Sequence, residues 1–303
     1  MHKQLEYNQK GISIDFLKAF RTFEEATNQK ALTAQYLCQR LPALLSVEKE
    51  CTKILDVGCG DGALSIPLYN FLSVIYGECL IVDLLEPSEE MTDSFKKRYE
   101  TQKGKRFKIG NIFNEKWETF EKKENYNFIL CSHVMYNIFE NTHLTRELKL
   151  GYLRKFKQFL KTNGLICIIY HASEGNEAHF VRKEFYKKFN FPNIISSGKD
   201  LETALGVLGY RYTRENIYAL LGIDWCLIRP SGITSLKGER LLDFMLGYPY
   251  KDIAPAIKKE IDVLLGKLMH PLQDMPLCLS SFLHNQNNCL IIKSDVFMVK
   301  NNL

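Results

Sequence analysis

The spacing of the apolar residues changes near residue 50. Before that point, Phe16, Phe20 and Phe23 fall at i, i+4 and i+7, which is one face of a helix. A second helical stretch runs over 31–45. We therefore expect residues 1–45 to form a helical N-terminal cap.

From residue 53 onward, short apolar runs alternate with helical stretches. The apolar runs that predict strands lie at 53–58, 79–87, 106–110, 126–134 and 164–172. The helical patterns between them lie at 62–73, 88–103, 115–123 and 144–161. Strands that alternate with helices favour a parallel sheet with helices on both faces. Residues 50–172 are therefore expected to be a doubly wound α/β core.

The pattern after residue 172 is mixed. Helices are expected at 176–190, 199–208, 238–247 and 255–269, and strands at 210–228 and 289–299. No internal repeat or linker divides the chain, so we expect one fold over residues 1–303. The alternative is that 174–197 and 230–285 form a small lobe of their own.

Composition and charge narrow the class of protein. The chain has 303 residues, of which 46% are hydrophobic and 25% charged, as in a folded globular protein. Its net charge of +5 is spread out, so nucleic acid is not an expected partner. Nine cysteines without a C-x-x-C pair predict reduced thiols and no metal site.

The sequence predicts neither a membrane-spanning segment nor a secretory signal. The apolar stretch at 71–85 contains Glu78 and Asp83 and is too short to cross a bilayer. The first ten residues are polar, without the apolar region of a secretory signal. We expect a cytoplasmic monomer that does not enter membranes.

The sharpest motif is DVGCGDG at 56–62, placed where a strand turns into a helix. Its glycines let a ligand approach the backbone closely. Gly58-x-Gly60-x-x-Ala63 also fits the loose dinucleotide fingerprint, which leaves a nicotinamide or flavin enzyme as a rival. Asp56 and Asp61, however, would repel a pyrophosphate and suit a ligand that carries an ammonium or sulfonium group, such as S-adenosylmethionine.

Two further strand ends carry polar residues. Glu86 ends the second strand, where one carboxylate can accept hydrogen bonds from both hydroxyls of a ribose. The alternative is that it caps the following helix. The third strand closes with Gly110, Asn111 and Ile112, and an amide beside an apolar side chain there could meet an adenine edge.

Together, the motif at 56–63, Leu85-Glu86-Pro87-Ser88, the segment 128–138 and the helix and strand over 198–226 resemble the class I S-adenosylmethionine-dependent methyltransferases. The resemblance covers most of the chain and is closer to the histamine N-methyltransferases. It implies a Rossmann-like sheet with a helical N-terminal cap and inserted helices that form a substrate lobe. The implied cofactor is S-adenosyl-L-methionine, and the residues expected to hold it are Asp56, Gly58, Gly60, Glu86, Asn111, Ile112 and Ser132.

The same resemblance implies where a small-molecule substrate binds. The cap would consist of residues 1–45 with 174–197 and 230–285, beside the cofactor-binding core at 50–172. The substrate-binding residues that it implies are Phe16, Phe20, Gln29, His133, Tyr136, Asn137, Asn176, Phe180, Phe244 and Asn285. The aromatic residues among them could equally be plain core.

The end of the fourth strand, 131–137, is expected to face the methyl group, because ligands of such sheets lie outside the carboxyl ends of the strands. Methyl transfer from a sulfonium depends mainly on proximity and orientation. An amine acceptor must arrive neutral, so His133 is a candidate to accept or orient its proton, with Tyr136 beside it. The alternative is a buried histidine bonded to backbone.

Four positions depart from the histamine enzymes' pattern. Gln29 stands where a glutamate is expected, Asn137 where a tyrosine is expected, and Asn176 and Phe180 replace two tryptophans. An uncharged Gln29 cannot pair with a cationic substrate, which argues against histamine and for another small amine or imidazole compound. The remaining alternatives are an RNA or protein methyltransferase and a non-catalytic relative that acts as a sensor or partner protein.

Overall fold

The computed structural model describes the chain in two compact units. The described residues are 7–8, 11–12, 14–45, 51–102, 107–121, 124–141, 143–189, 196–227, 235–281, 283 and 286–301, with side chains described from residue 17 onward except those of residues 78 and 189. Unit 1 comprises Met1–Lys30, Glu174–Asn193 and Tyr218–Lys293, and unit 2 comprises Ala31–Ser173, Ile194–Ile217 and Ser294–Leu303. The predicted cap therefore differs from unit 1 in part, because residues 31–45 belong to unit 2 and 218–229 to unit 1.

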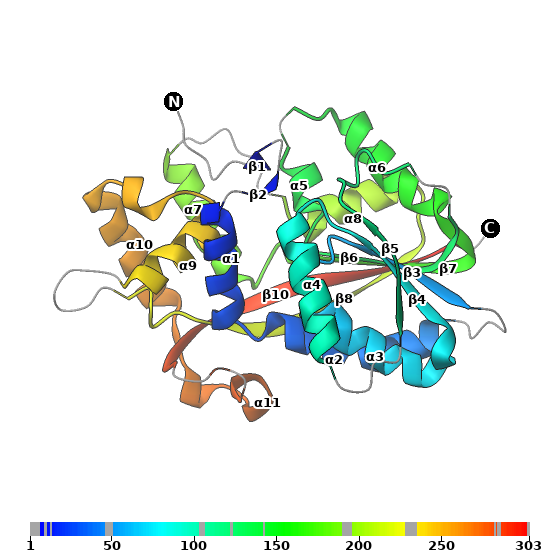
Figure 1. Cartoon of the computed structure of the whole chain (residues 1–303). Helices are drawn as coiled ribbons and strands as arrows, with labels where there is room; N and C mark the ends of the chain where they lie inside the picture. The colour runs from blue at the N-terminus through cyan, green and yellow to red at the C-terminus, as the bar shows by residue number, and fades with distance from the viewer. Residues whose placement is uncertain are drawn as a thin grey trace. The chain divides into compact units, whose positions relative to one another are not determined.

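The sheet follows the order β5-β4-β3-β6-β7-β10-β8. Its strands are β3 (Thr52–Val57), β4 (Leu80–Leu85), β5 (Lys108–Phe113), β6 (Tyr126–Ser132), β7 (Leu160–His171), β8 (Tyr212–Gly222) and β10 (Asn288–Lys300). The first five are parallel neighbours, as the sequence predicts, and β10 runs antiparallel to β7. The α/β fold with a closing strand is thereby confirmed (Figure 1).

Helices cover both faces of the sheet in unit 2. They are α2 (Gln29–Leu44), α3 (Ser65–Tyr76), α4 (Glu89–Thr101), α5 (Tyr136–Phe139), α6 (Arg146–Gln158) and α8 (Gly198–Val207). Successive side chains of β6 point to opposite faces of the sheet. Ile129 and Cys131 pack toward α6 and α8, whereas Phe128 and Leu130 pack toward α2 and α3. Figure 1 shows these two pairs of helices on opposite sides of the strands.

Three local predictions for unit 2 are wrong. The described part of the expected helix 115–123 is a single turn, in which Thr119 and Phe120 both donate to the Lys116 carbonyl. This short segment places Trp117 against Phe156, with ring centroids 4.2 Å apart, and burial of these rings outweighs helical propensity. The third strand is β5, which runs to Phe113 instead of ending at residue 110. The structure also joins Cys51 to Cys79 in a disulfide, where reduced thiols were expected.

Unit 1 is mainly helical. It contains α1 (Ile14–Ala26), α7 (Glu177–Phe189), α9 (Leu236–Leu246), α10 (Pro255–Leu268) and the short α11 (Leu277–Ser280), with β9 (His270–Pro271) beside β10. The predicted aromatic face of the first helix packs as expected, since Phe20 and Phe23 lie 5.7 and 4.4 Å from the Phe244 ring. At the start of the chain, a strand pair, β1 (Tyr7–Asn8) and β2 (Gly11–Ile12), replaces the expected helix.

Among the described residues, the structure has no helix that is both long enough and apolar enough to span a bilayer.

Candidate functional site

The glycine motif forms a tight turn at the carboxyl end of β3. Gly58, Gly60 and Gly62 have φ of +68°, +56° and +77°, the left-handed region that favours glycine. The Gly58 amide donates to the Leu85 carbonyl at 2.7 Å, which fixes the turn beside the end of β4. A Cβ on Gly58 would collide with Val134, the residue that follows His133. The turn therefore lies against the end of β4 and against the Val134 side chain, just after β6.

Replacing Gly62 with alanine is expected to destabilise the fold by about 2–4 kcal/mol, because the new Cβ would lie 2.7 Å from Phe95 and 2.8 Å from Ile66 in a left-handed backbone. Gly77 is a matched control, because it has the same φ of +77° and nothing within 4 Å of an added Cβ. Gly77→Ala should cost only about 1–2 kcal/mol. Urea unfolding measures both, and equal losses would contradict the packing argument.

Glu86 is held at the end of β4 with its carboxylate against the glycine turn. Gly60 N–H donates to Glu86 Oε2 at 3.2 Å, and Ser88 N–H donates to Oε1 at 3.0 Å. The Glu86 side chain is 6% exposed. Ser88, not Glu86, is the N-cap of α4 and accepts from the Met91 amide, while Glu86 accepts from the backbone amide of this N-cap residue. The carboxylate is thus fixed at the carboxyl edge of the sheet.

The two aspartates that flank the turn have different surroundings. Asp61 pairs with Arg98 and also accepts from the Ala63 amide at 3.1 Å, so its charge is compensated. Asp56 is buried beside Tyr69, whose pKa is raised by burial and by this carboxylate. Burial raises the pKa of the Cys59 thiol well above its usual value, and Asp56 and Glu86 add to the effect. The turn remains negative, but through Asp56 and Glu86 instead of the two aspartates expected from sequence.

Asn111 does not lie at a strand end. Its backbone amide donates to Asp83 Oδ1 at 2.6 Å and its side-chain amide contacts both Asp83 oxygens at 3.3 Å, within the sheet between β4 and β5. The prediction that Asn111 and Ile112 close the third strand is therefore wrong. The polar residue after β5 is Asn114, which donates to the Glu86 carbonyl at 3.2 Å and to Thr92 at 3.1 Å.

Aromatic and imidazole rings gather at the ends of β6 and β7. Ser132 ends β6, and His133 follows it with φ +55°, its amide donating to the Ile169 carbonyl at 2.9 Å. The His133 and His171 rings lie 5.4 Å apart, and Tyr136 stacks on His171 at 5.5 Å. The sequence interpretation missed His171, although its place at the end of the fifth predicted strand was a usable signal.

The other predicted substrate residues are distributed over both units. Asn137 is half-buried in α5 of unit 2, whereas Phe20, Gln29, Asn176, Phe180 and Phe244 belong to unit 1. Gln29 is buried, and its backbone amide donates to Thr27 at 3.1 Å. The side chain of Phe16 and all of Asn285 lie outside the described residues.

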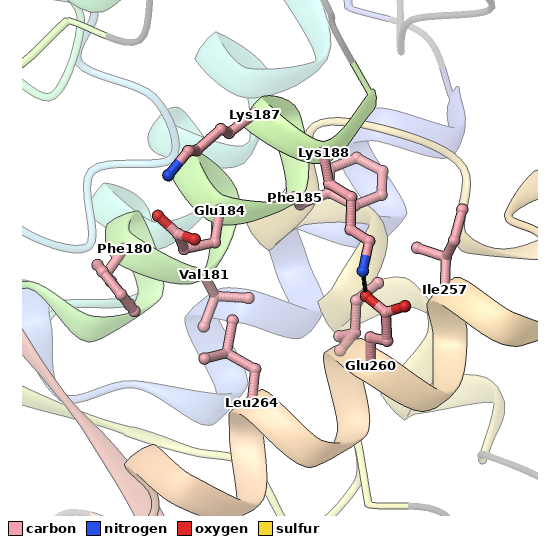
Figure 2. Close-up of a pocket in the computed structure, with 10 residues that line it drawn as sticks. Phe180, Val181, Glu184, Phe185, Lys187, Lys188, Ile257, Glu260 and Leu264 are labelled. Carbon is pink, nitrogen blue, oxygen red and sulfur yellow. Dashed lines mark ion pairs between the residues drawn. The ribbon is translucent and has the colours of Figure 1, made fainter.

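Asn176 and Phe180 have local roles in unit 1. The side-chain oxygen of Asn176 accepts from the His179 amide at 2.9 Å at the start of α7, and its side-chain nitrogen donates to the Lys293 carbonyl at 2.8 Å. Both polar atoms of the carboxamide therefore form hydrogen bonds within unit 1. Phe180 lines a groove of about 440 Å³ between α7 and α10, opposite Leu264. Figure 2 shows this groove, with the Lys188–Glu260 ion pair at its other end.

Within the described parts of the chain, no three histidine, cysteine, aspartate or glutamate side chains come together as a metal centre.

Comparison with known proteins identifies related chains. The family described as "Methyltransferase domain" matches residues 48–218. Malonyl-[acyl-carrier protein] O-methyltransferase 2 of Ilyobacter polytropus is 22% identical over 280 residues, which cover 86% of this chain and 98% of that protein. The family match spans the glycine turn and the ends of β4, β6 and β7.

Solved structures show the same fold. Loganic acid methyltransferase with SAH has a TM-score of 0.52 at 13% identity, covering 93% of this chain and 95% of that one. A Bacillus halodurans C-125 protein, provisionally described as a methyltransferase, has a TM-score of 0.51 at 12% identity, covering 88% and 99%. At this identity the likeness concerns the fold alone.

Proposed function

The chain belongs to the methyltransferase domain family, and we propose that it transfers a methyl group from S-adenosyl-L-methionine to a nitrogen atom of a small amine or imidazole compound. The observation that carries the cofactor part is the Glu86 carboxylate, held against Gly60 at 3.2 Å at the carboxyl edge of the sheet. The acceptor part rests on the cluster formed by His133, Tyr136 and His171.

The residues at the turn fit this cofactor. Glu86 presents an anchored carboxylate that can accept from both ribose hydroxyls. Gly60 has no side chain, and the space where a Cβ would lie is open, with Met91 as its neighbour at 3.5 Å. A ligand can therefore approach the Gly60 backbone closely. Asp56 and Glu86 supply the negative charge that suits a ligand carrying an ammonium and a sulfonium. When bound, the cofactor supplies an electrophilic methyl group.

The residues after β6 suit a neutral nitrogen acceptor. A primary alkylamine with a pKa near ~10 is mostly protonated at neutral pH, and only its neutral form has a lone pair to react. His133 offers an imidazole nitrogen, the side-chain group that most often accepts a proton in catalysis near neutral pH. Tyr136 and Asn137, on the helix that follows, can orient the acceptor by hydrogen bonds.

We expect S-adenosylmethionine to bind the purified protein in a calorimetric titration. Methyl-labelled S-adenosylmethionine should then label members of a panel that contains imidazoles, primary and secondary amines, carboxylic acids, RNA and unrelated proteins, with label on the nitrogen compounds. Failure to bind the cofactor would reject the whole proposal. Label on a carboxylic acid, on RNA or on protein would reject a nitrogen compound as the acceptor. Carboxylic acids are a relevant test because the name of the Ilyobacter relative is that of an O-methyltransferase. Binding without any transfer would favour the sensor alternative.

A further inference from the structure

Three rings from two segments of unit 2 lie in a row at the carboxyl edge of the sheet. Tyr136 and His171 are stacked at 5.5 Å with planes 21° apart, and His171 and His133 follow at 5.4 Å with planes 44° apart. His171 is the middle ring, so it contacts both residues to which the proposed chemistry assigns a role. The sequence interpretation did not include it.

The backbone also ties His133 to the strand that carries His171. His133 adopts φ +55°, a left-handed conformation that is uncommon for a residue with a side chain. Its amide donates to the Ile169 carbonyl at 2.9 Å, and Ile169 lies two residues before His171 in β7. Such an unusual conformation persists only where the surroundings fix it, and it is enriched at functional sites.

We propose that His171 is a positioning residue that orients the His133 ring and shares the proton that His133 takes from the acceptor. The proposal rests on the proposed function and deepens it. During transfer, the acceptor nitrogen forms a bond to the methyl carbon, and the carbon–sulfur bond breaks with its electron pair staying on sulfur. The proton lost by nitrogen moves to a ring nitrogen of His133, and the pair of imidazoles holds it until it passes to water.

The decisive variants separate ring stacking from hydrogen bonding. His171→Phe keeps an aromatic ring against Tyr136 but removes both ring nitrogens. His171→Gln removes the ring but keeps a donor and an acceptor. If His171 shares a proton with His133, His171→Phe lowers kcat by roughly 10- to 100-fold, while the KM of the acceptor and the Kd of S-adenosylmethionine stay unchanged. His171→Gln should recover part of the lost kcat. The exposed His143→Gln is the matched control and should behave like wild type.

The outcomes are distinct. The acceptor used is the panel compound that wild-type protein labels fastest, and each variant is checked by thermal unfolding. Wild-type kcat in His171→Phe, or a lower kcat in His171→Gln than in His171→Phe, would overturn the role of His171 and leave the proposed function intact. If wild-type protein binds the cofactor but labels no nitrogen compound, the proposed function fails and the role of His171 fails with it.

Discussion

Replacing Glu86 with alanine is expected to weaken the binding of S-adenosylmethionine by roughly 100-fold, which corresponds to about 3 kcal/mol. The hydrogen bonds proposed between the ribose hydroxyls and this carboxylate would be lost. The carboxylate also accepts hydrogen bonds from the N–H groups of Gly60 and Ser88 at 3.2 and 3.0 Å, and these groups would lose their acceptor. Calorimetric titration with S-adenosylmethionine measures the effect directly, without any need for a methyl acceptor.

Two further variants sharpen this test. Glu89→Ala removes an exposed acidic residue from the first turn of α4 and should leave cofactor affinity unchanged. Glu86→Gln keeps one acceptor oxygen, so its affinity should fall between wild type and Glu86→Ala. Wild-type affinity in Glu86→Ala, with the fold intact by circular dichroism, would remove the ribose assignment.

Replacing His133 is expected to lower kcat by roughly 100-fold with little change in the Kd of S-adenosylmethionine, because general acid–base catalysis contributes about 10²–10⁴-fold. His133→Asn is the better variant, since asparagine tolerates the left-handed φ of +55° more readily than alanine does. Steady-state kinetics with the best acceptor of the panel gives kcat, and calorimetry gives the Kd.

Comparing the Glu86 and His133 variants tests the assignment of their roles more sharply than either variant does alone. Glu86→Ala should act on cofactor binding and His133→Asn on turnover. A comparable loss of both quantities in each variant would mean that the two residues support the fold of the strand ends instead of separate steps. The Gly62→Ala and Gly77→Ala pair gives an independent measure of how far changes at the turn affect stability.

Most of the sheet could be predicted from the sequence. The five parallel strands and the helices around 62–73, 88–103 and 144–161 each carry their own hydrophobic period, and that period depends only on neighbours along the chain. The prediction failed at 115–121, where Trp117 packs on Phe156 and the contact overrides local preference. It also placed the end of β5 too early, because nothing local marks where pairing with β4 stops.

The candidate site, like the sheet, could be predicted from the sequence only in part. The positions of the glycine turn, of Glu86 at the end of β4 and of His133 after β6 could be predicted, because each is a residue type at a strand end, and strand ends follow from the local pattern. The three-dimensional fold was needed to show that Arg98 compensates Asp61, that Asp83 engages Asn111 and that His171 lies against His133. These contacts join residues far apart along the chain, and their geometry is set by strand order and register, which no local pattern encodes.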